Sequence, residues 1–142
     1  MAEAVILVGV PGAGKTTYYR AHLAETHTVI SGDIQGAVRN QMALLDACIQ
    51  SALSFAVDNT NVTRAARAPL IRKAKDAGYR MVCCFFDTPV RTAIGRNNHR
   101  GDKKAIPVPA ILKSAKQLQP PAMEEGFDEL RVIRLPNEGW HT

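Results

Sequence analysis

The stretch GVPGAGKT at residues 9–16 is the strongest indication of the fold, and it follows the apolar run AVILV at residues 4–8. It matches the phosphate-binding loop pattern, GxxxxGK followed by Ser or Thr, between an expected buried strand and an expected helix. The glycines let the main chain wrap closely around phosphate groups, toward which N–H groups and the helix N-terminus point. This stretch therefore predicts a nucleotide-binding α/β domain.

The side chains of this loop predict how a nucleoside triphosphate binds. Lys15 is expected to contact the β- and γ-phosphates, and the Thr16 hydroxyl is expected to ligate Mg²⁺. The hydroxyl of Thr17 is a candidate partner for the α-phosphate. We therefore expect ATP, or another nucleoside triphosphate, together with Mg²⁺, for which Thr16 is the predicted protein ligand. The expected nucleotide-binding residues are Gly12, Ala13, Gly14, Lys15, Thr16 and Thr17.

Alternating apolar runs and helical patterns continue along the chain. Apolar runs predict strands at residues 4–8, 28–31, 53–57, 80–86 and 130–135. Helical spacing and capping residues predict helices at 15–25, 34–50, 63–78, 88–96 and 107–117. This alternation predicts an α/β fold, an open parallel sheet of about five strands with helices on both faces. With no repeat or linker, residues 1–142 are expected to form a single P-loop kinase domain.

Three local features refine these helices. The apolar residues at 34, 38, 42, 45 and 49 predict one buried face along a continuous helix over 34–50. Pro69 predicts a kink, or a late start, in the helix that Thr63 caps. The polar, basic segment 97–104 is expected to be a loop.

The composition, 46% hydrophobic and 22% charged, is that of a folded soluble protein. No apolar run approaches the roughly 20 residues that span a bilayer, and no basic segment precedes an apolar one as in a secretory signal. The three cysteines, Cys48, Cys83 and Cys84, lack metal-ligand or disulfide spacing and favour a reducing compartment. We expect a cytoplasmic protein without a membrane partner.

The net charge of +5 is unevenly distributed. Residues 61–116 contain 13 Lys and Arg against 3 Asp and Glu, whereas the segments before and after are acidic. One interpretation is a surface that attracts nucleic acid or nucleotide phosphates. The other is a solvated helical face, and charge alone leaves both open.

Acidic residues at strand ends bear on the kind of P-loop protein, because ligands bind at the carboxyl ends of parallel strands. Asp33 follows the second expected strand, where it is either a base that accepts a hydroxyl proton or the N-cap of a helix. Asp58 follows the third, either as the acidic residue behind Mg²⁺ or as a turn residue. The Asn/Thr-Lys-x-Asp signature of GTPases is absent, and a motor ATPase would need a longer chain.

Arg91, Arg96 and Arg100 lie close together around the segment RNNHRGDKK, residues 96–104. Small kinases use a mobile lid whose arginines neutralise charge on the transferring phosphoryl group. Arginine suits this role because its planar fork binds two oxygens at once. The alternative is a solvated basic turn.

The residues together resemble the polynucleotide 5′-hydroxyl kinases over nearly the whole chain. The resemblance rests on GVPGAGKTT, SGD at 31–33, DNTN at 58–61, RNNHR at 96–100, IP at 106–107 and EGF at 125–127. It implies that Asp33 is the general base, that Lys15 and Thr16 handle the triphosphate and Mg²⁺, and that Arg96 and Arg100 are lid arginines. It also implies transfer of the γ-phosphate of ATP to a 5′-hydroxyl of single-stranded or end-frayed DNA or RNA. Because 142 residues leave no room for the phosphatase or ligase domain often fused to such kinases, a stand-alone kinase module is expected.

One position departs from the family. In its viral branch, an arginine three residues after the base binds the acceptor phosphate, but Gly36 occupies that position here. Arg39 is a candidate replacement, and Asn61 and Arg64 are further candidates for acceptor contact. Two other functions stay open: a kinase for a small-molecule hydroxyl, which needs no extended cationic surface, and a non-catalytic nucleotide-binding module, which leaves Asp33 and the arginines without a purpose.

Overall fold

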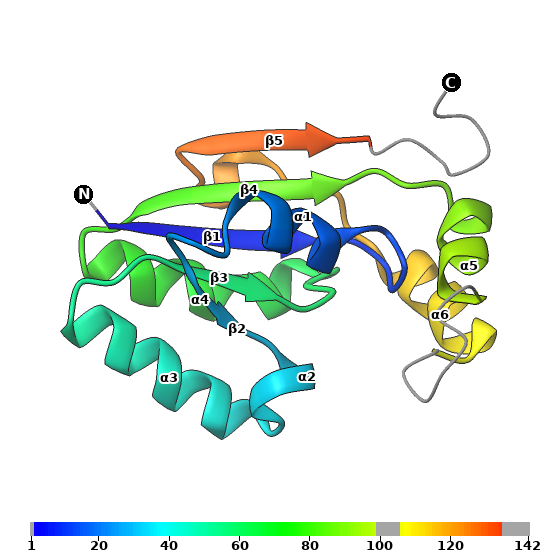
Figure 1. The fold of residues 1–142 in the computed structure, drawn as a ribbon. Helices are drawn as coiled ribbons and strands as arrows, with labels where there is room; N and C mark the ends of the chain where they lie inside the picture. Colours follow the sequence, from blue (N-terminus) through cyan, green and yellow to red (C-terminus); the bar gives the residue numbers. More distant parts are fainter. Residues whose placement is uncertain (1, 99–105, 135–142) are drawn as a thin grey trace.

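Five parallel strands, in the order β2–β3–β1–β4–β5, form the central sheet of the computed structural model (Figure 1). The structure describes residues 2–98 and 106–134. The strands are β1 (Glu3–Val8), β2 (Thr28–Ile30), β3 (Phe55–Asp58), β4 (Arg80–Phe86) and β5 (Glu129–Ile133). Because all five run in one direction, their carboxyl ends meet at one edge of the sheet. The predicted α/β class and parallel sheet are confirmed.

Helices cover both faces of this sheet. One face packs against α3 (Val38–Gln50) and α4 (Arg64–Asp76), and the other against α1 (Lys15–His22). Helices α5 (Val90–Asn98) and α6 (Val108–Gln117) add Ala93 and Ile111 to the second core cluster. Along β1, Ala4, Ile6 and Val8 belong to the first core cluster, while Val5 and Leu7 belong to the second. Burial on both sides explains why the strand reads as an unbroken apolar run. Figure 1 shows α5 and α6 beyond the carboxyl ends of the strands.

The predicted continuous helix over residues 34–50 is wrong. The chain forms the short helix α2 (Gly32–Gln35), breaks at Gly36, and resumes as α3. Gly36 has φ 79° and ψ −120°, a conformation that a residue with a Cβ rarely adopts. Ile34 and Val38, expected in the core, are 64% and 70% exposed. Ile34 belongs to the separate helix α2, and Val38 is the first residue of α3, about two turns before the buried Leu45.

Of the two expectations for Pro69, a kink or a late start of the next helix, the late start is wrong. The Thr63 hydroxyl accepts a hydrogen bond from the Ala66 N–H at 3.1 Å, so α4 begins at Arg64 and includes Pro69. Asn97 and Asn98, expected in a loop, belong to α5. Thr88 donates its hydroxyl hydrogen bond to the Ala13 carbonyl at 3.0 Å, and so ties the start of α5 to the phosphate loop. No helix within the described ranges is long and apolar enough to span a membrane.

One arginine of the basic stretch lies in the core. Arg67 is fully buried in α4, and its guanidinium pairs with Glu125 through Nε–Oε1 at 2.8 Å and Nη2–Oε2 at 3.0 Å. It also donates to the carbonyls of Asn61 and Gln119 at 2.8 and 2.9 Å. These bonds connect α4 to the segment that leads into β5, including the short 3-10 helix η1 (Met123–Glu125). Arg67 is thus unavailable to a nucleic-acid surface.

We predict that Glu125→Ala lowers the free energy of unfolding by about 3–5 kcal/mol, because it leaves the Arg67 charge buried without its partner. Burial acts to raise the pKa of Glu125. Two stabilising effects outweigh burial and hold this pKa below its usual value: the hydrogen bonds that Glu125 accepts from Arg67 and from the Ala122 N–H, and the positive charge of Arg67. Because the pKa of Glu125 is lower in the folded protein than in the unfolded chain, the ionised carboxylate stabilises the fold at any pH above the pKa of the unfolded chain. This stabilisation is lost as the pH falls through the pKa of the folded protein. The difference between the two proteins should therefore shrink below about pH 4.5.

Chemical denaturation over a pH series measures this difference. Arg72→Ala is the matched control, because Arg72 is exposed on the same helix and should change stability by less than about 0.5 kcal/mol. An equally small effect of Glu125→Ala at neutral pH would contradict the prediction.

Candidate active site

The phosphate loop joins the end of β1 to the start of α1. Gly12 and Gly14 have φ of 85° and 103°, in the left-handed region that favours glycine. A Cβ on Gly12 would lie 2.3 Å from the Ala93 carbonyl oxygen, so the loop packs directly on the backbone of α5. Gly14 is the N-cap of α1 and offers no capping side chain. The N-terminus of α1 therefore retains the N–H groups and positive dipole end that bind an anion.

Lys15 extends into the curve of this loop. Its ammonium donates hydrogen bonds to the carbonyls of Gly9 and Val10, both at 2.8 Å, and the side chain is largely buried. A cation in this position, surrounded by backbone N–H groups, suits the phosphates of a nucleotide. The donor set of the loop thus fits a nucleoside triphosphate.

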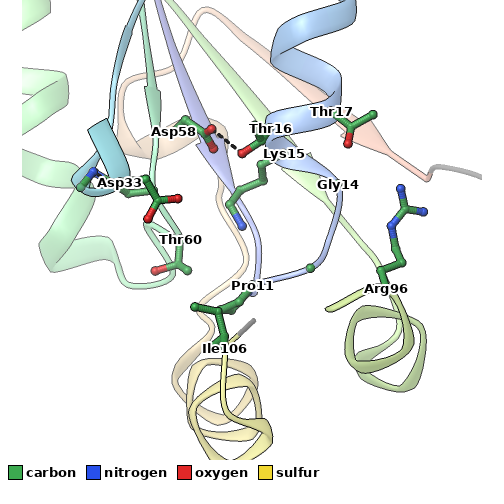
Figure 2. A pocket seen from close by; sticks show the side chains of 13 residues that line it. Pro11, Gly14, Lys15, Thr16, Thr17, Asp33, Asp58, Thr60, Arg96 and Ile106 are labelled. Carbon is green, nitrogen blue, oxygen red and sulfur yellow. Dashed lines mark hydrogen bonds between the residues drawn. The ribbon is translucent and has the colours of Figure 1, made fainter. Parts of the chain in front are cut away.

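Thr16 and Asp58 bring the first turn of α1 to the end of β3. The Thr16 hydroxyl donates a hydrogen bond to Asp58 Oδ2 at 2.7 Å (Figure 2). Asp58 is the last residue of β3 and lies opposite Leu7 of β1 in the parallel register. Within the described residues, no group of three His, Cys, Asp or Glu side chains forms a metal site of its own. A hydroxyl, one carboxylate and substrate phosphates are, however, the ligands with which Mg²⁺ is commonly held.

Asp33 lies at the start of α2 and lines the same pocket. The N-cap of α2 is Ser31, whose hydroxyl accepts from the Ile34 N–H at 3.2 Å, so the alternative that Asp33 is the cap is wrong. The carboxylate of Asp33 is exposed and has no hydrogen bond or ion pair to the described residues. Figure 2 shows it directed into the space beside Lys15 and Thr60. Asp33 is therefore available to accept a proton from a bound hydroxyl.

The pocket has a volume of about 500 Å³. Figure 2 shows Asp33 on one side and Arg96, from the end of α5, on the other, with Lys15 between them. The lining residues are Pro11, Gly12, Gly14, Lys15, Thr16, Thr17, Gly32, Asp33, Asp58, Asn59, Thr60, Arg96 and Ile106. The structure thus brings Arg96 and the predicted nucleotide-binding residues other than Ala13, which is buried in the second core cluster, to one pocket with Asp33.

Three candidate acceptor residues do not line this pocket. Arg39 and Arg64 are exposed, and Arg64 pairs with Glu124 at 3.0 Å. Asn61 is buried, and its side-chain amide donates to the Leu7 carbonyl at 2.8 Å and to the Val57 carbonyl at 3.4 Å. Asn61 therefore supports the junction of β1 and β3, because its amide bonds to their backbones. Arg100 and the rest of 99–105 lie outside the described residues.

Asn59 and Thr60 line the pocket but were not predicted as site residues, although their position in the sequence indicates such a role. Asn59 and Thr60 directly follow β3, and polar residues after a parallel strand fall at the ligand-binding edge of the sheet. Ile106 follows the basic segment and is held by Asn97, whose side-chain amide donates to the Ile106 carbonyl and accepts from its N–H, at 2.6 and 2.8 Å. Reciprocal contacts of this kind depend on the three-dimensional fold and have no sequence signature.

The basic stretch is divided between two surfaces. On and next to α4, several cations have acidic partners: Arg64 with Glu124, Arg67 with Glu125, Lys73 with Asp46, and Arg80 with Glu129. Helices α5 and α6 carry Arg91, Arg96, Lys113 and Lys116 and contain no acidic residue. Arg96 reaches the pocket, and α6 contacts α5. Of these four basic residues, Arg96 lies at the pocket, and the other three lie on this pair of packed helices.

Comparison with solved structures finds the same fold in several nucleotide-dependent proteins. The structure of the Pnkp1/Rnl/Hen1 RNA repair complex matches with a TM-score of 0.72 and 23% identity, over 89% of this chain and 46% of that one. A sugar kinase from Janibacter sp. matches with a TM-score of 0.71 and 18% identity, over 98% and 90%. Kti12 from Chaetomium thermophilum, in complex with ADP-AlF3, matches with a TM-score of 0.68 and 16% identity, over 95% and 90%. This chain spans less than half of the matched chain in the RNA repair complex.

The parallel sheet and the phosphate loop define an α/β domain of the P-loop type, and these solved structures share its fold. A family model described as an AAA domain matches residues 5–121, and the chain belongs to that family.

We predict that Asp58→Asn weakens Mg²⁺-dependent nucleotide binding by about 10- to 100-fold, because the charge behind the Thr16 hydroxyl is lost. Asparagine keeps a side-chain oxygen that accepts the Thr16 hydrogen bond, so binding in EDTA should stay at the wild-type level. Titration of a fluorescent ATP analogue with Mg²⁺ and with EDTA measures both affinities. Asp76→Asn, at the exposed end of α4, is the matched control. Equal losses with Mg²⁺ and with EDTA would show that Asp58 acts on the fold instead.

Proposed function

We propose that this domain transfers the γ-phosphoryl group of ATP to the 5′-hydroxyl end of a DNA or RNA strand. One observation carries the proposal. The Asp33 carboxylate, which has no hydrogen bond to the described residues, faces a pocket that also contains Lys15, Thr16 and Arg96. A carboxylate in such a position serves a reaction in which a hydroxyl loses its proton.

In the proposed reaction, Asp33 accepts the proton of the 5′-hydroxyl while the hydroxyl oxygen forms a bond to the γ-phosphorus. The bond from the γ-phosphorus to its bridging oxygen breaks, and that electron pair leaves on ADP. Lys15 and Arg96 stabilise negative charge on the phosphoryl oxygens, and Thr16 with Asp58 would hold Mg²⁺. Mg²⁺-ATP supplies the phosphoryl group and a positive charge that neutralises its oxygens. The proton on Asp33 then passes to solvent.

The cationic helices α5 and α6 support a nucleic-acid acceptor. The two helices carry four basic residues and no acidic one, and Arg96 among them lines the pocket. A net positive charge on this pair of helices would attract a phosphodiester backbone. The likeness to the RNA repair complex, at 23% identity, agrees with this substrate class.

A second candidate is a kinase that phosphorylates a small-molecule hydroxyl. The match to the sugar kinase, over 90% of that chain, favours it, and the same base and phosphate loop would serve it. The two candidates differ in the use of the α5–α6 surface, because a small neutral acceptor gains nothing from charge outside the pocket.

We predict that Asp33→Asn lowers kcat by about 10²–10⁴-fold, the usual contribution of a positioned base, and leaves the Kd for ATP unchanged. Transfer of labelled phosphate to a 5′-hydroxyl oligonucleotide measures kcat, and titration with ATP measures Kd. Asp76→Asn again serves as the control. Wild-type turnover in Asp33→Asn, or a loss confined to ATP affinity, would contradict the role of Asp33 as base.

We further predict that the affinity for a single-stranded acceptor falls log-linearly with salt, with a slope of about −0.7 per neutralised phosphate. Replacing Lys113 and Lys116 of α6 with Gln should make this slope shallower without changing kcat at saturating acceptor. Replacing Arg72 on α4, on the other face of the sheet, should leave the slope unchanged. The measurement is KM for one oligonucleotide over a salt series. A slope near zero, with sugars phosphorylated as fast as oligonucleotides, would favour the small-molecule kinase.

A further inference from the structure

Asp33 is carried by α2, which has only four residues. A helix of this length is unstable by itself, because forming the first turn costs more conformational entropy than its few hydrogen bonds return. Yet the position of a catalytic base has to be accurate, since a displacement of about 1 Å lowers a reaction rate by roughly 100-fold. The contacts that hold α2 therefore bear directly on the proposed reaction.

Side-chain amides hold the two ends of α2. The exposed Asn40 of α3 donates from Nδ2 to the carbonyl of Gln35, the last residue of α2, at 3.1 Å, and two further amides are joined to each other. Asn59 Oδ1 accepts from the N–H of Gly32, the first residue of α2, at 2.9 Å. Gln41 of α3 donates from Nε2 to the carbonyl of Gly36, the residue that ends α2, at 2.8 Å. Gln41 Oε1 also accepts from Asn59 Nδ2 at 2.8 Å, so the two amides are joined.

Gln41 is 7% exposed, although glutamine is ordinarily a surface residue. Its carbonyl and its amino group both have partners, as burial of an amide requires. An apolar side chain of similar size would fill this position without needing any of these bonds. The buried amide is therefore explained by what it holds in place.

Asn59 also connects α2 to the nucleotide site through the chain itself. Its neighbour Asp58 accepts the Thr16 hydrogen bond at 2.7 Å, while Asn59 accepts that of Gly32. Two consecutive residues at the end of β3 thus contact the phosphate-loop helix on one side and the helix that carries Asp33 on the other. The separation of base and triphosphate depends on this short segment.

We propose that Gln41 is a positioning residue for Asp33: by orienting Asn59 and the end of α2, it sets the place of the carboxylate relative to the phosphate loop. The inference rests on the proposed role of Asp33 as base. Ser31 and Gln35 stabilise α2 locally. Ser31 Oγ accepts a hydrogen bond from the Ile34 N–H, and Gln35 Nε2 donates one to the Val29 carbonyl of β2. Gln41 and Asn59 fix the position of α2 relative to α3 and β3.

The test compares Gln41→Met, which keeps the size of the side chain and removes both hydrogen bonds, with Gln50→Met. Gln50 is exposed at the end of the same helix, and no hydrogen bond of its side chain occurs among the described residues. Gln41→Met should lower kcat by about 10- to 100-fold with an unchanged Kd for ATP. Amide hydrogen exchange at Gly32, measured without acceptor, should become faster. Gln50→Met should change neither quantity.

A double-mutant cycle separates positioning from a general effect on the fold. In the Asp33→Asn background, Gln41→Met should cause no further loss of kcat, because the base on which it acts is gone.

Equal losses in the two backgrounds would overturn the inference. The inference would also be overturned if Asp33→Asn strongly lowered kcat while Gln41→Met, like Gln50→Met, left kcat unchanged. Failure of the proposed function gives a different result, since Asp33→Asn would then keep the wild-type kcat.

Discussion

The parallel pairing of β1 with β3 is the constraint on which the site depends. It sets Asp58 opposite Leu7, at the point where β1 gives way to the phosphate loop, and so brings a carboxylate within 2.7 Å of Thr16. Asn61 holds this junction by bonding to the backbones of both strands. The next residue after Asp58, Asn59, reaches α2 and with it Asp33. The nucleotide site and the candidate base are therefore arranged around a single strand end.

The strongest local patterns predicted the fold best. The continuous apolar run of β1 and the glycine loop after it specify a buried parallel strand followed by a helix, and the RMVCCFF run matches β4 from Arg80 to Phe86. The break between α2 and α3 was missed because apolar residues at 34 and 38 continue the helical spacing, while the conformation of Gly36 overrides it. Spacing describes which residues share a face of a helix, and it cannot tell whether the helix continues.

The site was predicted in part for similar reasons. Lys15, Thr16, Thr17 and Asp33 follow from the loop pattern and from the ends of strands, and the structure brings them to one pocket. Asn61, a candidate for acceptor contact, bonds instead to the Leu7 carbonyl, and Arg67, one cation of the basic stretch, pairs with Glu125. Both partners are far away in the sequence. The EGF stretch at 125–127, noted for its resemblance to a kinase family, has a stabilising contact of its own, because Glu125 pairs with the buried Arg67. Burial decides whether a basic residue belongs to a binding surface, and sequence alone does not reveal burial.

The proposed acceptor is a 5′-hydroxyl end of a nucleic-acid strand, and transfer of the labelled γ-phosphate of ATP shows which acceptor the domain uses. The assay offers one oligonucleotide with a 5′-hydroxyl, the same oligonucleotide with a 5′-phosphate, and a panel of sugars. The proposed function predicts that label appears on the 5′-hydroxyl strand and is absent from the 5′-phosphorylated strand and from the sugars. Label on a sugar with the 5′-hydroxyl strand unmodified would contradict it.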